Sequence, residues 1–89
     1  MFTVSDITSL RKSPFKIIQA NYHDVMFNSE RTGHDWIIIS YYDSSKCFIL
    51  HRHSRRYPFH RQKGNYRSFK EALDYITEHE EWFETNKGR

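Results

Sequence analysis

Apolar residues recur with helical spacing in the last third of the chain, where one side of a helix would be apolar and the other acidic. At 100° per residue the apolar stripe comprises Phe69, Ala72, Leu73, Ile76 and Phe83. Ser68 and Glu71 form an S-x-x-E capping box just before it. The pattern therefore predicts an amphipathic helix over residues 68–85. Glu80 falls inside the apolar stripe near its end, so we expect the last turn to pass the edge of the core.

A second pattern, rich in β-branched and aromatic residues, occupies the middle of the chain. It covers residues 35–42 and again 46–53, and Asp43-Ser44-Ser45 between them has the composition of a tight turn. These two segments predict a β-hairpin. Residues 15–28 predict further β-structure, either as one strand with an irregularity or as two strands, and a polar turn follows at 29–33.

Two further segments complete the pattern. A short helix is expected over about residues 5–13, because Ser5 can cap it and Pro14 stops it. Residues 54–67 contain Pro58 and Gly64, and predict an irregular basic loop with at most a short edge strand around residues 57–61.

Together these elements predict a single α+β domain spanning residues 1–89. We expect two layers: a three- to four-stranded antiparallel meander sheet, with the short N-terminal helix and the longer C-terminal helix packed on one face. A chain of 89 residues has room for one domain, and its aromatic share of 17% supplies enough apolar area for a core.

The hairpin also predicts which side chains share a sheet face. With a two- or four-residue loop, one face carries Ile37, Ile39, Tyr41, Phe48, Leu50 and Arg52, and the other carries Trp36, Ile38, Ser40, Tyr42, Cys47, Ile49, His51 and His53. The first set is more uniformly apolar, so we expect it to pack under the helices. Trp36 and Tyr42 on the second face would then either mark a contact site or be covered by another segment or a partner.

Charge is distributed unevenly along the chain, although the net charge is only +3. Residues 51–70 carry seven Lys or Arg residues and no acid, whereas residues 71–84 carry six acids and no Lys or Arg. Arginine neutralises phosphate groups and aromatic rings stack on bases, so cations interleaved with aromatics predict single-stranded RNA or DNA binding. The residues expected to bind nucleic acid are Arg52, Arg55, Arg56, Tyr57, Phe59, Arg61, Lys63 and Arg67.

Two other interpretations of this charge pattern remain open. The acidic helix could neutralise the basic loop within the molecule, or the loop could be an ordinary solvated surface. A protein-binding adaptor or inhibitor, such as a small mobile-element protein, is the alternative function. It would use Trp36, Tyr42, Tyr75 and Trp82 and would suit an acidic protein partner or a homodimer. Trp82 is otherwise expected to clamp the N-terminal helix or residues 2–4.

Histidines raise two further hypotheses. His51 and His53 lie about 7 Å apart on one strand face, so a metal site would need a third ligand from His23, His34 or His60. Two histidines alone are a weak signal, and neither a metal nor a cofactor is expected. A small metal-independent ribonuclease could use His51, His53 and His60 with Arg52, Arg56 and Tyr57, but no motif supports catalytic residues.

Several classes are excluded or disfavoured by composition. Cys47 is the single cysteine, which excludes an internal disulfide framework and a cysteine-based zinc cluster, and we expect it to be an inert core residue. The longest strictly apolar run, residues 36–39, is too short to span a bilayer, and no signal peptide is expected. A cytoplasmic protein without a membrane partner is therefore predicted.

Overall fold

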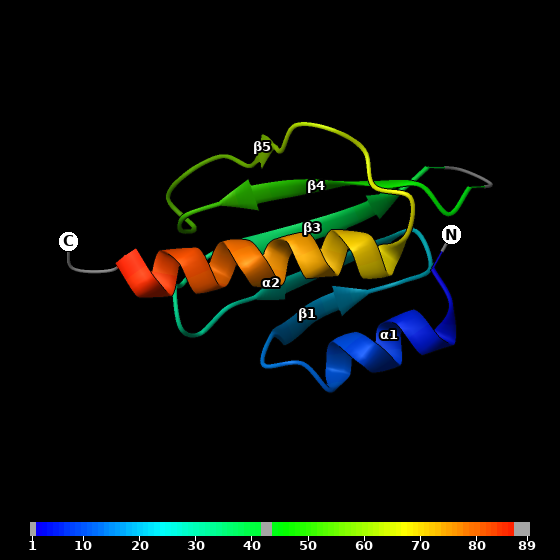
Figure 1. The fold of residues 1–89 in the computed structure, drawn as a ribbon, viewed down its shortest axis with the longest axis horizontal. Helices are drawn as coiled ribbons and strands as arrows, with labels where there is room; N and C mark the ends of the chain where they lie inside the picture. The colour runs from blue at the N-terminus through cyan, green and yellow to red at the C-terminus, as the bar shows by residue number, and fades with distance from the viewer. Residues whose placement is uncertain (1, 42–43, 87–89) are drawn as a thin grey trace.

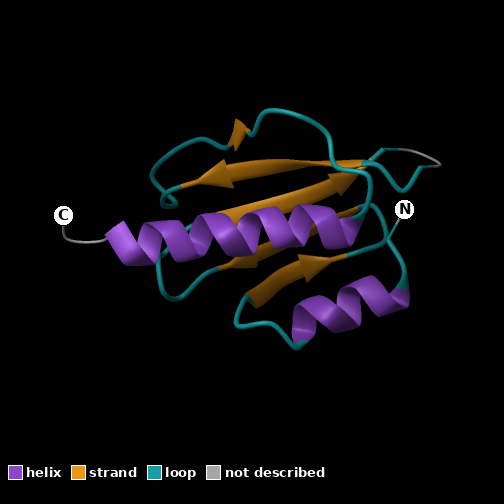
Figure 2. Cartoon of the chain, in the orientation of Figure 1, coloured by secondary structure: helices purple, strands orange, loops and turns teal. Residues whose placement is uncertain are grey.

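The computed structural model describes residues 2–41 and 44–86 and has two layers, a sheet and two helices. The order along the chain is α1 (Val4–Arg11), β1 (Lys16–Ala20), β2 (Asp24–Asn28), β3 (Asp35–Ser40), β4 (Cys47–Arg52), β5 (His60–Arg61) and α2 (Phe69–Asn86). The strands form one antiparallel meander in the order β1-β2-β3-β4-β5, and both helices lie on the same side of it (Figure 1 and Figure 2). The expected α+β class is confirmed, with five strands rather than three or four.

Local hydrogen bonds explain where the helices begin. Thr3 caps α1: its hydroxyl accepts from the backbone N–H of Asp6, and the Asp6 carboxylate accepts from the backbone N–H of Thr3. This capping box starts α1 at Val4, so the expected Ser5 cap is wrong. At α2 the backbone N–H of Glu71 donates to Ser68 Oγ at 3.2 Å, as the sequence predicts.

The segment expected over residues 15–28 forms two strands. Asn21 Oδ1 accepts from the backbone N–H groups of both His23 and Asp24 at 2.8 Å, which holds the turn between β1 and β2. The alternative of one strand with an irregularity is therefore wrong, and a register shift between Ile17 and Gln19 within β1 was not predicted. The turn before β3 ends at Gly33, whose φ of 79° suits glycine.

The hairpin of β3 and β4 has the expected grouping of side chains but buries the opposite face. Ile37 pairs with Leu50 and the backbone N–H of Tyr41 donates to the carbonyl of Lys46, so the loop is the four-residue alternative. The two sets of side chains are therefore grouped as predicted. Trp36 and Ile38, however, are fully buried under the helices, and Ile37 is only half-buried. The predicted choice of buried face is wrong.

Polar partners explain why the less uniformly apolar face is the buried one. The indole Nε1 of Trp36 donates to Glu80 on α2 at 2.6 Å, and His51 hydrogen-bonds His34, so neither buried polar group lacks a partner. The apolar stripe of α2 then completes this core through Phe69, Ala72 and Ile76. We call this side the covered face and the other side the open face.

Neither helix of the described residues combines the length and the apolar character that crossing a bilayer requires.

Candidate functional site

A row of polar side chains crosses the open face over β2, β3 and β4. Asp35 is fully buried and accepts from Asn28 Nδ2 at 2.8 Å and from Arg52 Nε at 2.7 Å. The guanidinium of Arg52 also lies over the ring of Phe59, 4.2 Å from its centroid. A buried ion pair and a ring therefore fix the position of Arg52, and only its Nε hydrogen-bonds within the described residues.

A second arginine is fixed in the same way on the open face. Arg61 pairs with Leu50 across the strands and places its guanidinium 4.3 Å from the centroid of the Phe48 ring. Its terminal nitrogen donates to the Tyr41 hydroxyl at 2.7 Å and to Asn65 Oδ1 at 2.9 Å. Arg52 thus lies over Phe59, and Arg61 lies over Phe48 and hydrogen-bonds Tyr41. We call these five residues the arginine–aromatic edge.

The remaining expected nucleic-acid residues lie in the two segments that flank β5. Arg55, Arg56 and Tyr57 are exposed in the turn between β4 and β5, and Tyr57 has 58% of its surface exposed. Lys63 and Arg67 are exposed in the connection from β5 to α2. Cys47, the first residue of β4, bridges to Tyr66, so that connection runs beside the start of β4. Arg52 is the last residue of β4, at the other end of the strand.

Among the described residues, the acids of α2 bond to the basic segment only at its junction with the helix, where Lys70 pairs with Asp74 and the backbone N–H of Arg67 donates to Glu71 Oε2 at 3.3 Å. α2 covers one side of the sheet (Figure 1). Arg52 and Arg61 belong to the other side, because Arg52 is next to the buried His51 in β4 and pairs with Asp35, and Arg61 pairs with Leu50 of the open face. The acids of α2 form ion pairs with Arg31, which contacts Glu84 at 3.1 Å, and with Lys70, which lies on α2 itself. Within residues 2–41 and 44–86, no ion pair joins an α2 carboxylate to the basic turn or to the arginine–aromatic edge. Among the described residues, the contacts that support internal neutralisation are therefore limited to the junction of the basic segment with α2.

Of the residues expected for protein interaction, Tyr75 and Trp82 share one side of α2, where the ring of His79 stacks on both. Trp36 is fully buried, so its expected role as an exposed contact residue is wrong, and Tyr42 lies outside the described residues. Tyr75 is half-buried against Tyr66, with ring centroids 5.4 Å apart. Trp82 keeps 58% of its surface exposed.

The expected clamp between Trp82 and the N-terminal segment is also wrong. Phe2 packs edge-on against Phe69, with ring centroids 5.0 Å apart, at the first turn of α2. Trp82 lies thirteen residues further along the helix, about 20 Å away at 1.5 Å per residue. Its ring packs against Phe83 on its own helix instead.

Three histidines meet at the end of the covered face where β3 begins and β4 ends. Asp35 pairs with Arg52, so His34 and His53 come next to each other one step beyond, and their rings stack at 4.6 Å. His51 Nε2 and His34 Nδ1 are 2.9 Å apart. One ring nitrogen from each of His34, His51 and His53 lies within 4.8 Å of the other two. We call these residues the histidine cluster; His34 was one of three candidates for the third member.

Glu80 is a buried carboxylate beside this cluster that the sequence did not single out as functional. It is 1% exposed, and its Oε1 accepts from Trp36 Nε1 and from the Thr32 hydroxyl at 3.1 Å. Its Oε2 has no hydrogen-bond partner among the described residues. The available signal was its place inside the apolar stripe: an acid there must find a buried polar partner, rather than mark the edge of the core.

Burial favours the neutral form of His34 and His51. Together with the neighbouring His34 and His53, burial lowers the pKa of His51 to about 3. Burial also lowers the pKa of His34, against the opposing charge of Glu80. Neutral imidazole has one nitrogen lone pair available for a hydrogen bond or for a metal ion.

The residues of the ribonuclease hypothesis are divided between the two sides of the sheet. His51 belongs to the covered face and is 5% exposed, while Arg52 belongs to the open face with Asp35. Arg56 and Tyr57 are in the exposed turn. Arg52 and His51 therefore lie on opposite sides of the sheet and do not meet in the way phosphate cleavage would use.

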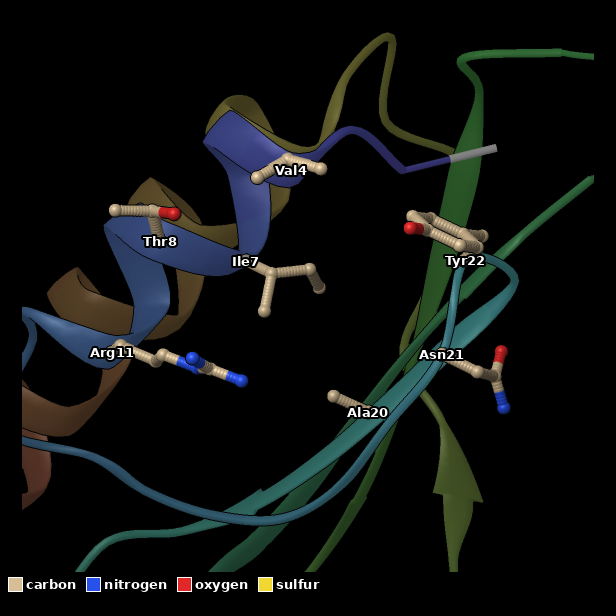
Figure 3. A pocket seen from close by; sticks show the side chains of 7 residues that line it. All are labelled: Val4, Ile7, Thr8, Arg11, Ala20, Asn21 and Tyr22. Atoms are coloured by element: carbon tan, nitrogen blue, oxygen red, sulfur yellow. The ribbon is translucent and has the colours of Figure 1, made fainter.

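A separate pocket of about 290 Å³ lies between α1 and the turn that joins β1 to β2. Figure 3 shows Val4, Ile7 and Arg11 of α1 facing Tyr22 of that turn. Its lining includes no residue of the basic segment or of the histidine cluster. It is distinct from both candidate sites.

Comparisons with protein-family models, with curated proteins and with solved structures find no match to this chain.

Proposed function

We propose that the protein binds single-stranded nucleic acid, RNA or DNA, along the arginine–aromatic edge of the open face. The observation that carries the proposal is the placement of Arg52 and Arg61, each stacked on an aromatic ring, on the side of the sheet away from the acidic helix. Both guanidinium groups are held by neighbours of fixed geometry, so binding phosphate would cost little side-chain entropy.

The surroundings of this edge suit a flexible polyanion. Arg55 and Arg56 extend the positive charge past one end of β4. Lys63 lies alongside β4, between Gln62 and Tyr66, which both hydrogen-bond that strand, and Arg67 follows at the other end. A chain of phosphates following the edge would meet cations over the length of β4, six residues or about 20 Å at the usual strand rise. Counterion release from these phosphates would supply most of the affinity.

Aromatic and apolar side chains offer a surface for unpaired bases. Tyr57 is exposed in the turn, and Tyr41 is 36% exposed beside Phe48. Ile37 and Leu50, which pair across β3 and β4 and are half-buried, add apolar surface to the open face. Bases stack on such rings in a sequence-tolerant way, and they can do so only when unpaired, so a single strand is favoured over a duplex. The proposal includes a cytoplasmic location, which follows from the sequence expectation alone.

Equilibrium binding at several salt concentrations tests the proposal. Fluorescently labelled single-stranded RNA, single-stranded DNA and a duplex of the same length are titrated with the protein. We expect single strands to bind more tightly than duplex, and their affinity to fall steeply with salt. The double variant Arg55→Ala/Arg56→Ala should reduce the slope of log K against log[salt] by about 1.4, at about 0.7 per phosphate contact.

A matched control separates this site from general positive charge. The double variant Arg11→Ala/Lys12→Ala removes the same charge from α1, where both side chains are exposed on the other side of the sheet. It should leave the slope unchanged. No binding to any single strand at low salt would overturn the proposal, and so would an equal effect of the two double variants.

A further inference from the structure

We propose that His34, His51 and His53 form a binding site for a divalent transition-metal ion, Zn²⁺, with a fourth coordination position open to solvent. The site lies on the covered face and shares no residue with the arginine–aromatic edge, so the two proposals stand or fall separately.

The spacing of the ring nitrogens fits tetrahedral zinc. A Zn–N distance of about 2.0–2.1 Å and a tetrahedral angle place two ligand nitrogens about 3.3 Å apart. In the cluster the nitrogens of His51 and His34 are 2.9 Å apart, and all three nitrogens lie within 4.8 Å of one another. The required separation falls within this range. Small side-chain rotations would complete the geometry, together with a tautomer change that moves the proton of the His34–His51 hydrogen bond to the other ring nitrogen of its histidine.

The backbone holds the three ligands in place before any ion arrives. His51 lies in β4, and its strand partner Trp36 stacks on its ring with centroids 3.9 Å apart. His34 precedes β3 and stacks on His53, so the antiparallel register of one strand pair sets all three positions. Such preorganisation lowers the entropic cost of binding.

Charge and exposure of the surroundings also fit a cation. Glu80 is a buried carboxylate next to the cluster whose Oε2 has no partner within the described residues, so a positive ion nearby would compensate its charge. The rings of His79 and Phe83 on α2 flank His51 at 5.9 Å and 6.1 Å, and shield it from water. His53 is exposed, which gives a metal ion an entry path and leaves room for a water ligand.

The chemistry of the donor set selects the class of ion. Three neutral imidazoles suit Zn²⁺ and its neighbours in the first transition row, whereas Mg²⁺ and Ca²⁺ prefer oxygen ligands. Three histidines with one open position are the arrangement used where zinc keeps an exchangeable water.

Isothermal titration of metal-stripped protein, freed of any histidine tag, with ZnCl₂ tests the site. We expect one Zn²⁺ per chain, with no competition from millimolar Mg²⁺. His53→Ala removes the exposed ligand without opening the core and should weaken binding at least tenfold. Co²⁺ bound to the parent protein should show the visible absorption of a tetrahedral complex, and that absorption should be lost in His53→Ala.

His23→Ala is the matched control. His23 is an exposed histidine in the turn at the far end of the sheet, and its carbonyl accepts from the backbone N–H of Ser40. Its removal should change zinc affinity by less than twofold. The proposal is overturned if the parent protein binds no zinc below millimolar concentration. It is also overturned if His53→Ala binds as tightly as the parent, or if His23→Ala loses as much as His53→Ala.

Discussion

Replacement of Glu80 by alanine should destabilise the protein strongly, although Glu is normally a surface residue. Its carboxylate is 1% exposed and is the acceptor for Trp36 Nε1 at 2.6 Å and for the Thr32 hydroxyl at 3.1 Å. The truncation would leave the indole N–H of a fully buried tryptophan without an acceptor.

The size of the effect follows from these contacts. Hydrogen bonds to a charged group contribute about 1.5–3 kcal/mol each, and an unpaired buried donor costs about 1–3 kcal/mol. Removing a buried charge offsets part of this loss, because burial of the carboxylate is itself unfavourable. We therefore expect Glu80→Ala to lower the free energy of unfolding by about 2–4 kcal/mol, a large fraction of a total that is typically about 5–15 kcal/mol.

Urea denaturation followed by tryptophan fluorescence and circular dichroism measures the change. Glu81→Ala is the matched control, because Glu81 is the next residue of α2 and is exposed. It should change the free energy of unfolding by less than about 0.5 kcal/mol. Glu80→Gln keeps an acceptor for the indole and should lose less than Glu80→Ala.

A double-mutant cycle with Trp36→Phe isolates the hydrogen bond itself. Trp36→Phe removes the donor, so Glu80→Ala should cost less in that background, with a coupling energy of about 1–3 kcal/mol. Equal effects of Glu80→Ala and Glu81→Ala, or a coupling energy near zero, would refute the reasoning.

Three further predictions concern the core. Ile38→Ala should lower the free energy of unfolding by about 2–5 kcal/mol, because Ile38 is fully buried. Ile39→Ala should lower it by less than half as much, because Ile39 is only half-buried. The reverse order in urea denaturation would contradict the assignment of the covered face. Burial raises the pKa of the Cys47 thiol to about 11, so iodoacetamide at pH 7.5 should alkylate it only after unfolding, and mass spectrometry showing rapid alkylation of native protein would disprove this. With chelator present, the free energy of unfolding should fall as pH drops below 6.5. His51 contributes up to about 1.4 kcal/mol per pH unit, and His34 and His79, whose pKa values burial also lowers, add to the fall. The cause is that burial holds the pKa of His51 at about 3 in the folded state, so the unfolded chain binds the proton first; denaturation at pH 7, 6 and 5 with no such trend would count against it.

The elements of the fold were accessible from the sequence because each has a strong local signal. The apolar stripe and the Ser68 cap define α2, and the two β-branched runs around Asp43-Ser44-Ser45 define the hairpin of β3 and β4. β5 is only two residues long and falls within the weak edge strand expected over 57–61. Its position is set by pairing with β4, which no local pattern specifies.

The choice of buried face was not accessible, because it depends on partners distant in sequence. Counting apolar residues favoured the face of Ile37 and Leu50, whereas the helices cover the face of Trp36 and His51. That face can be buried because Glu80, forty-four residues beyond Trp36, satisfies its indole. A long-range hydrogen bond of this kind overrides the apolar count, and its local signal was the acid at position 80 inside the apolar stripe, which does not name its partner.

The two candidate sites differ in how much of each could be recognised from the sequence. The basic segment was visible as a run of charge, and the hairpin pattern already placed Arg52 on the face opposite His51 and His53. Only the pairing of β5 with β4 places Arg61 on the same face as Arg52. The histidine cluster depends on the register that brings His34 beside His53, nineteen residues later in the chain.

The most direct test of nucleic-acid binding is to observe the arginine side chains themselves. Nitrogen-15 spectra of the labelled protein report the Nε–H signal of each arginine before and after addition of a short single-stranded RNA. The signals of Arg52 and Arg61 are predicted to shift in proportion to bound RNA, whereas that of Arg11 on α1 stays unchanged. Unchanged signals from Arg52 and Arg61 at saturating RNA, or shifts confined to arginines on the helix side, would contradict the account.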